Sequence, residues 1–379
     1  MEFLTWNQVL RHRFARHSLI DPAPATHIVQ VVKRVGGIHA QVMGAAELSI
    51  SARIPAATQA DVRAELWERR RLIKTYGPRG TLHLLAADEL PLWMAALRAR
   101  IDSPQTHWYA STGWSSRQAQ AVVQAISDAL DGRCLTREEL AQDVVARVGR
   151  WAEKPLASMW GDPASAWAAY TGKLCFGPAR GSRVTFVRAD QWVGRWNEVD
   201  PSEALVEICR RYLAAFGPAR PQDFAEWFGL QPEHARTVFE ALGDELQAVN
   251  LEGHHAWRLA SDARDLIALG QPSLRLVPQY DSYIMGCRER DRYLPEKARA
   301  RIATHARGRF EGPAAMSWML VDGVVAGTWE RRKQGKRIEM QVEPLIRLTT
   351  ALRRQLEAEA ERIARFLGTD GDLEVVKSL

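Results

Sequence analysis

The strongest constraint on the fold is a pattern that recurs along the chain: a helix, a turn, a second helix and then a hairpin containing glycine. In the clearest copy, an apolar stripe that begins after Pro221 is followed by Gly229, a residue suited to a helix end, and by Pro232, a residue suited to a helix start. Two short apolar runs, 246–251 and 256–259, then flank a loop that contains glycine. This order of elements predicts a winged helix.

Two earlier segments show the same order of elements. In one, Thr136 and Glu139 form a T-x-x-E capping box ahead of a helix, and 174–176 and 184–187 predict the strands of a wing. In the other, a helix over 59–70 precedes strands over 72–76 and 81–85. The sequence therefore predicts three tandem winged-helix units.

After about residue 271 the pattern changes to strands. Expected strands cover 274–277, 316–321, 324–330 and 336–343, with glycine-containing turns between them. A closing helix over 344–367 has leucines on one side and charged residues on the other, so we expect it to pack against these strands. The predicted fold class is α+β: three winged-helix units followed by an antiparallel β-sheet or barrel and a closing helix. The expected domains are 1–115, 116–195, 196–265 and 266–379.

Charge and composition limit the function classes. Basic and acidic residues, 51 against 45, give a net charge of +6 and a pI near 9.3, which makes nucleic acid a candidate partner. No run approaches the ~18 apolar residues of a membrane span, and the start lacks an export signal, so we expect a cytoplasmic protein without a membrane partner. The four cysteines lie far apart with no metal-binding spacing, so we expect no disulfide scaffold, metal or cofactor.

The predicted hairpin near residue 334 carries a cluster of cations with no acidic residue among them. Such a finger is suited to a phosphate backbone or a minor groove. The alternative is a hairpin tip that its charges keep soluble and monomeric. The cations are Arg331, Arg332, Lys333, Lys336 and Arg337.

The segment after Gly36-Gly37 holds the best catalytic candidates, His39 and Gln41. Side chains at i and i+2 point the same way on extended backbone but about 200° apart in a helix, and the glycines favour irregular backbone here. Histidine can act as a base or hold a water molecule, and glutamine can orient a water without carrying charge. From spacing alone, a structural His and Gln near a helix start is the more frequent arrangement, so that alternative stays open.

Five separated blocks resemble one protein family over nearly the whole chain. In order, they are 37–42 (GIHAQV) with 46–48 (AEL), 79–85 (RGTLHLL), 211–213 (RYL) with 216–218 (FGP), 276–286 (LVPQYDSYIMG), and 321–323 (VDG) with 327–329 (GTW). The chain resembles the AlkZ-like (YcaQ-like) winged-helix DNA glycosylases, bacterial proteins that remove alkylated bases and unhook interstrand crosslinks.

The resemblance implies a DNA glycosylase that needs no metal or cofactor. The family motif is Gln-aliphatic-Gln, or Gln-x-Asp in the YcaQ-like branch, and it positions the water that attacks the sugar. Gln41 matches the second Gln and His39 replaces the first, so both are expected to be catalytic. The matching blocks around His39 contain no lysine for a Schiff base, which predicts a monofunctional enzyme.

The resemblance also implies a partner and a mode of binding. The partner is double-stranded DNA with alkylated bases, with the sugar exposed from the minor-groove side. A monomer is the simpler expectation for a chain that already holds three DNA-binding units. Expected substrates are bulky N7-guanine adducts or crosslinks, in DNA repair or in self-resistance to a genotoxin. Further expected DNA contacts are Arg79, His83, Asp281, Tyr283, Arg288 and Arg290. A core position for His83 and a turn-capping role for Asp281 stay open as alternatives.

Two other functions are weighed against the glycosylase. Winged helices are more often regulators than enzymes, so the fold alone favours a transcriptional regulator. A damage binder that lost activity through the Gln to His change is the third candidate. Three different units in one chain, the appended sheet and the His-Ala-Gln motif favour the enzyme.

Overall fold

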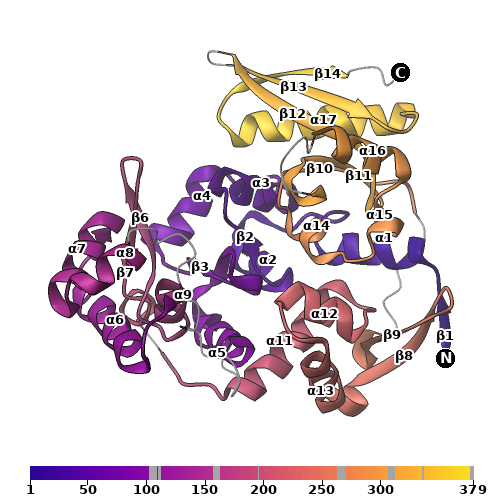
Figure 1. The fold of residues 1–379 in the computed structure, drawn as a ribbon. Helices are drawn as coiled ribbons and strands as arrows, with labels where there is room; N and C mark the ends of the chain where they lie inside the picture. Colours follow the sequence, from indigo (N-terminus) through magenta and orange to yellow (C-terminus); the bar gives the residue numbers. More distant parts are fainter. Residues whose placement is uncertain are drawn as a thin grey trace. The chain divides into compact units, whose positions relative to one another are not determined.

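The computed structural model describes residues 1–101, 109, 112–156, 163–194, 196–262, 270–305, 312–334 and 337–375 (Figure 1). The chain packs as two compact units. Unit 1 comprises Met1–Val62, Arg210–Trp227 and Gln231–Leu379, and unit 2 comprises Arg63–Cys209 and Phe228–Leu230. Both contain helices and sheets, which confirms the mixed α and β class.

The N-terminal part of unit 1 is mainly helical. Its elements are β1 (Glu2–Leu4), α1 (Trp6–Arg16), η1 (Ala25–His27), α2 (Ile28–Arg34), β2 (Ile38–His39), α3 (Met43–Arg53) and α4 (Gln59–Arg63), whose last residue belongs to unit 2. A capping box of Thr5 and Gln8 begins α1. Between α2 and β2, Gly36 and Gly37 have φ of 71° and 92°, a left-handed backbone that glycine adopts without steric cost.

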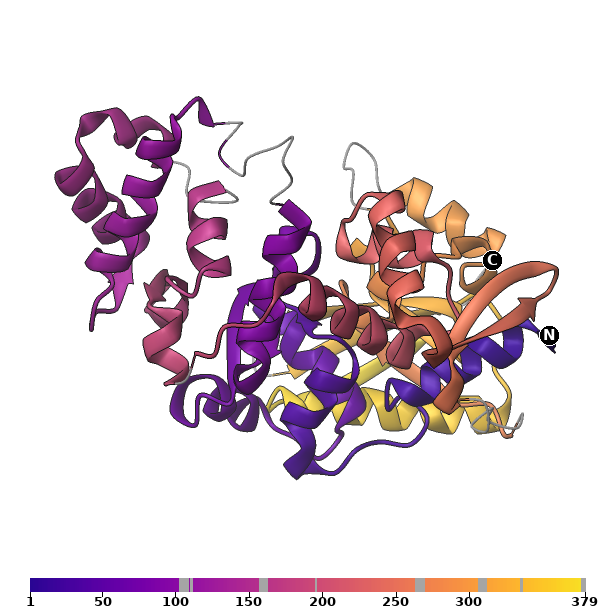
Figure 2. The same ribbon diagram turned by 90° about the horizontal axis from the view of Figure 1, so that it is seen from below.

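The predicted helix–turn–helix with a following hairpin is present over residues 221–259. It consists of α12 (Pro221–Phe228), α13 (Pro232–Leu242), η7 (Gly243–Glu245), β8 (Leu246–Leu251) and β9 (His254–Leu259), after α11 (Pro201–Phe216). Gly229 ends α12 with φ of 85°, and Pro232 occupies the first turn of α13. The N-terminal strand β1 joins this hairpin by pairing parallel to β8 (Figure 2).

Unit 2 contains the other two predicted hairpins. Its elements are η2 (Ala64–Glu68), β3 (Leu72–Tyr76), η3 (Pro78–Gly80), β4 (Leu82–Ala86), η4 (Ala87–Glu89), α5 (Leu90–Ile101), α6 (Ser116–Ala129), β5 (Leu135–Thr136), α7 (Arg137–Val148), η6 (Arg150–Ala152), α8 (Glu153–Leu156), α9 (Pro163–Tyr170), β6 (Cys175–Arg180), β7 (Arg183–Val187) and α10 (Ala189–Val193). The capping box of Thr136 and Glu139 is confirmed at the start of α7.

The strands of unit 2 form one sheet in the order β4-β3-β6-β7-β5. The two hairpins are joined through the pairing of Lys74 with Phe176. Because of this shared sheet, β3 and β4 pack with the second predicted unit, whereas α2 and α3 belong to unit 1. Three separate winged-helix units are therefore not confirmed, and the compact units follow different boundaries from the four expected domains.

The C-terminal part of unit 1 combines an open, mixed sheet with several helices. Its elements are η8 (Ala260–Asp262), β10 (Leu274–Val277), α14 (Ser282–Gly286), α15 (Arg290–Tyr293), α16 (Glu296–His305), η9 (Pro313–Ala315), β11 (Trp318–Val321), β12 (Val324–Gln334), β13 (Arg337–Pro344), α17 (Thr350–Phe366) and β14 (Asp370–Val375). The strand order is β10-β11-β12-β13-β14, and β14 pairs parallel to β13. The strand order does not close, so a barrel is not confirmed. The prediction of a purely antiparallel sheet is wrong, because the unpredicted strand β14, which comes after α17, pairs parallel to β13.

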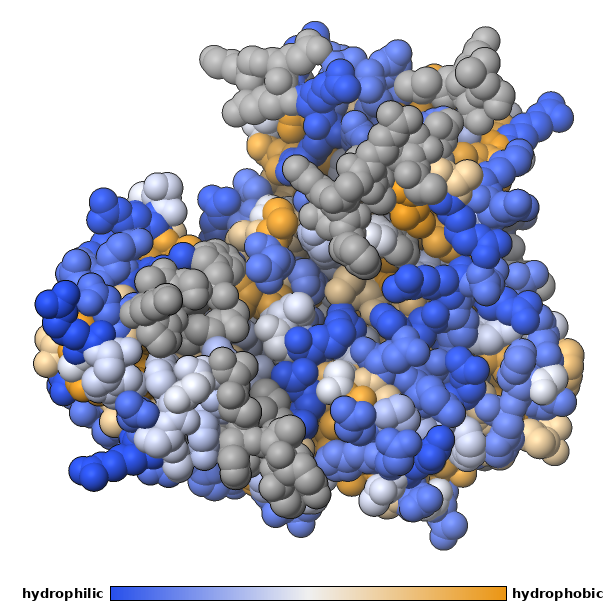
Figure 3. Space-filling view, viewed as in Figure 1, coloured by the Kyte–Doolittle hydropathy of each residue, from blue (hydrophilic) through white to orange (hydrophobic). Residues whose placement is uncertain are grey.

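The closing helix α17 packs on the C-terminal sheet as predicted (Figure 1). Leu352, Leu356 and Ile363 of α17 share one apolar core with Leu276 and Met340 of the sheet. On the face shown in Figure 3, hydrophilic residues predominate and apolar residues form small patches. Within the described ranges, no helix combines the length and apolar character needed to cross a membrane.

Candidate functional site

The His39-Ala40-Gln41 segment connects β2 to the start of α3. Its backbone leaves the helical path at Gly36-Gly37, is extended at His39 and enters α3 at Met43, as the glycines predicted. His39 is buried, with 5% of its surface exposed, whereas Gln41 is exposed. The next residue, Val42, is one of the few large apolar residues on the surface of the described chain, with 40% exposed. The segment thus presents a polar and an apolar side chain to solvent beside a buried imidazole.

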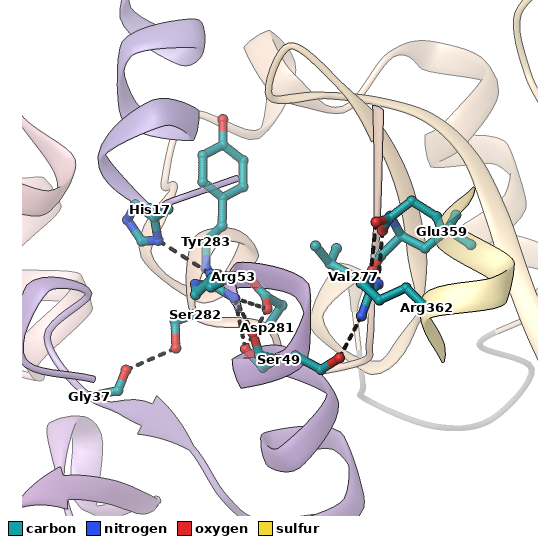
Figure 4. Close-up of polar contacts among 12 residues, drawn as sticks. His17, Gly37, Ser49, Arg53, Val277, Asp281, Ser282, Tyr283, Glu359 and Arg362 are labelled. Atoms are coloured by element: carbon teal, nitrogen blue, oxygen red, sulfur yellow. Dashed lines mark hydrogen bonds and ion pairs between the residues drawn. The ribbon is translucent and has the colours of Figure 1, made fainter. Parts of the chain in front are cut away.

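Residues from the start of α14 hold this segment in place. The ring of Tyr280 stacks on the imidazole of His39, with ring centroids 5.0 Å apart and planes inclined by 29°. Two residues further on, the Ser282 hydroxyl donates a 2.9 Å hydrogen bond to the Gly37 carbonyl (Figure 4). Tyr280 and Ser282 lie in the family block 276–286, but no local sequence pattern indicates a role for either residue.

A buried ion pair fixes α14 to α3. Both terminal nitrogens of Arg53 donate to the Asp281 carboxylate, at 2.7 and 2.8 Å, and the Ser49 hydroxyl donates to the same group at 2.5 Å (Figure 4). Burial alone would raise the pKa of Asp281, but the Arg53 charge and the hydrogen bonds lower it below its ordinary value. Burial and the Arg53 charge also hold the pKa of His17, 3.4 Å from Arg53, well below its ordinary value.

Asp281 and Tyr283 are therefore not placed at a DNA-facing surface, in contrast to our expectation. Both are buried to 0% exposure. Asp281 also caps α14 by accepting a hydrogen bond from the Tyr283 N–H, as the turn-capping alternative anticipated. The Tyr283 hydroxyl donates to the Gly323 carbonyl at 2.9 Å. These contacts assign both residues a structural role: Asp281 joins α14 to α3, and Tyr283 joins α14 to the turn at Gly323.

A second buried polar network ties α3 to the C-terminal helix. Arg362 of α17 donates to the Ser51 hydroxyl at 2.9 Å and forms an ion pair with Glu359 at 2.8 Å (Figure 4). Glu359 in turn accepts a hydrogen bond from the Leu276 N–H of β10. The helix that follows the His-Ala-Gln segment is thus anchored to both α14 and α17.

One cation of the basic hairpin, Arg331, lies close to the start of α3. A methyl group built on Gly44 would lie 4.0 Å from a terminal nitrogen of Arg331. Arg331 and Arg332 of β12 are exposed. Neighbouring protein atoms still remove part of the water around the Arg331 guanidinium, which lowers its pKa. Arg337 of β13 is exposed and lies 3.5 Å from Asp372. Lys336 lies outside the described residues, and only the backbone of Lys333 is described.

Arg288 and Arg290 line a pocket of about 470 Å³ next to α15, together with Trp6, Arg220 and Arg292. Arg288 is ion-paired with Glu226 at 2.5 Å, and Arg290 is exposed. The lining thus combines four arginines with three acidic residues, Asp223, Glu289 and Asp291.

Arg79 and His83 belong to unit 2, Arg79 at the turn between β3 and β4 and His83 within β4. Arg79 has a φ of 58°, and its side chain is partly exposed. His83 is 5% exposed, and its Nδ1 lies 3.0 Å from the Thr81 carbonyl, in agreement with a core histidine. A methyl group at Gly77 would approach the His83 ring to 2.7 Å, so this turn requires glycine.

Among the residues that the structure describes, no group of three or more His, Cys, Asp or Glu side chains could hold a metal ion. The four cysteines are free thiols.

Comparisons with known proteins agree with the resemblance of the motifs. The family model of AlkZ-like DNA glycosylases matches residues 32–366. An interstrand DNA cross-link repair glycosylase from Streptomyces sahachiroi is 31% identical over 371 residues, 96% of this chain and 97% of that protein. The solved structure of the Streptomyces sahachiroi DNA glycosylase AlkZ matches with a TM-score of 0.84 at 30% identity, covering 99% of this chain and 100% of that one. This chain belongs to the AlkZ-like family of DNA glycosylases.

Proposed function

We propose that this DNA glycosylase is monofunctional and hydrolyses the N-glycosidic bond of alkylated purines, with bulky N7-guanine adducts and crosslinks as substrates. The name of the Streptomyces sahachiroi relative, a cross-link repair glycosylase, supports the crosslink part. The observation that carries the proposal is the approach of Arg331 to the start of α3, directly after His39-Ala40-Gln41. A cation suited to DNA phosphate thus lies at the start of the helix that follows the two side chains suited to handling water.

The chemistry requires little acid catalysis. Alkylation at N7 gives the purine a positive charge, so the C1′–N9 bond breaks with its electron pair moving to the purine, which leaves neutral. The sugar develops oxocarbenium character, and a water oxygen forms the new bond to C1′ while the water loses a proton. In our proposal Gln41 orients the water through its uncharged amide. His39 binds the same water and accepts its proton, because a neutral imidazole can act as a base.

The cationic hairpin is our candidate for the minor-groove contact. Three of its cations have exposed side chains: Arg331, Arg332 and Arg337. The same cluster in the sequence also contains Lys333 and Lys336. Arg288 and Arg290 are proposed to contact backbone phosphates, supported by the exposure of Arg290 and by the excess of one arginine over the acidic residues that line their pocket. Arg79, which is partly exposed, stays a proposed contact in unit 2, whereas the burial of His83 favours its alternative role as a core histidine.

Replacing Arg331, Arg332 and Arg337 together by Ala should weaken binding to duplex DNA and flatten its salt dependence. If each arginine contacts one phosphate, the slope of log affinity against log salt should fall by about 2.7. The measurement is fluorescence anisotropy over a range of salt concentrations.

A matched triple variant separates position from net charge. Arg353, Arg354 and Arg365 are exposed on α17, and their replacement by Ala removes the same charge. The α17 variant should keep a slope near that of the wild type. Equal slopes for the two triple variants would contradict a hairpin contact.

The substrate part is tested by base release from duplexes carrying either N7-methylguanine or a bulky N7-guanine adduct. The proposal predicts release of the bulky adduct as free modified base, leaving an abasic site. Borohydride should trap no covalent protein–DNA complex, because no amine takes part. Release of N7-methylguanine alone would overturn the bulky-adduct specificity, and a trapped complex would overturn the monofunctional mechanism.

We further propose that the protein acts as a monomer on DNA in the cytoplasm, for repair or self-resistance to a genotoxin. A single chain holds the whole site proposed above. Light scattering with and without a duplex should give a mass of one chain, near 42.6 kDa, and one chain per duplex. A stable dimer would contradict this part.

A further inference from the structure

Tyr280 adopts a backbone conformation that a bulky residue rarely takes. Its φ is 60°, in the left-handed region that costs free energy for residues with a large side chain. Residues held in this way are often found at functional sites, where surrounding contacts enforce the conformation. The side chain that this backbone directs is the one stacked on His39.

Contacts on both sides of Tyr280 enforce this conformation. Its N–H donates to the Ala314 carbonyl at 2.6 Å. The next residue, Asp281, is locked to Arg53, and Ser282 holds the Gly37 carbonyl. The Tyr280 ring and the segment that carries His39 are therefore fixed relative to each other by a common set of buried bonds.

We propose that Tyr280 is a positioning residue that sets the plane of the His39 imidazole for the hydrolytic step. This inference rests on the proposed role of His39. An aromatic ring against one face of the imidazole restricts its rotation, and misplacement of a catalytic group by about 1 Å can cost about 100-fold in rate. The electron-rich ring face also favours the positive charge that His39 gains when it accepts the water proton.

The test compares Tyr280→Phe with Tyr280→Leu. Both variants keep a side chain at the left-handed position, but only Phe keeps a ring to stack. We expect Tyr280→Leu to lower the single-turnover rate of base release about 10- to 100-fold and Tyr280→Phe to keep a rate near wild type. DNA affinity and melting temperature should stay near wild type in both. Equal rates for Leu and Phe would overturn the inference.

A double variant shows whether Tyr280 acts through His39. If it does, adding Tyr280→Leu to His39→Ala should cause no further loss of rate, because the imidazole to be positioned is already absent. A double variant that releases base clearly more slowly than His39→Ala alone would overturn the inference. A His39→Ala protein with the wild-type rate would instead contradict the proposed role of His39, so the two failures are distinguishable.

Discussion

Gln41→Ala should slow base release from an adducted duplex by about 100-fold or more, while binding to the same duplex stays close to wild type. Gln41 is exposed at the entry to α3, so its amide is accessible to a bound sugar and water, and its loss removes no packing from the core. Removing one preorganised hydrogen-bonding group from a transition state typically costs 10²- to 10³-fold. Single-turnover release with excess enzyme measures this step.

Gln124→Ala provides the matched control. Gln124 is exposed on α6 and bonds only with Asp128 among the described residues, so its loss should not change the rate. A Gln41→Ala protein that releases base at the rate of Gln124→Ala would contradict the assignment of Gln41.

Asp281→Asn should lower the free energy of unfolding by about 3–5 kcal/mol, the largest stability effect that we expect. The substitution leaves Arg53, which is also 0% exposed, as an uncompensated buried charge. Denaturant unfolding at neutral pH measures the loss. As a control, Asp143→Asn removes an acid from partly exposed pairs with Arg133 and Arg147 and should cost less than about 1 kcal/mol. Similar losses for both variants would contradict the importance of the buried pair.

The same buried network predicts that the free energy of unfolding depends on pH. The pKa of Asp281 in the folded protein lies below its ordinary value of 3.8. Its contribution to the free energy of unfolding is therefore complete above about pH 3.8 and is lost as the pH falls toward the folded pKa. The folded pKa of His17 also lies below its ordinary value of 6.5, so stability should begin to fall below about pH 6.5. His17→Phe should flatten the curve between about pH 6.5 and 4.5. An unchanged slope in that window would contradict a neutral buried His17.

Local signals in the sequence predicted much of the fold. The capping box at Thr136, the Gly229 stop and Pro232 start, and the Gly36-Gly37 break each depend on neighbouring residues, and each is confirmed. The helix expected over 59–70 is shorter, as α4 followed by the π-helical turn η2 (Ala64–Glu68). Ends of elements are harder to predict because tertiary contacts decide them.

Contacts between distant parts of the chain could not be predicted. Arg53 and Asp281 are separated by 228 positions, and Ser282 and Gly37 by 245, so no local pattern shows that they meet. Asp281 and Tyr283 appeared suited to DNA contact because they are polar residues in a family block, and only the fold shows that they are buried. The strand β14 was missed for the same reason, since its pairing partner precedes the closing helix.

The most direct test of the account is mass spectrometry of the products formed by the wild-type protein from a duplex carrying one bulky N7-guanine adduct. The account predicts free adducted guanine in an amount equal to the abasic strand, without added metal or cofactor. Tight binding to the adducted duplex with no free base after many hours would contradict it and indicate a damage binder or regulator.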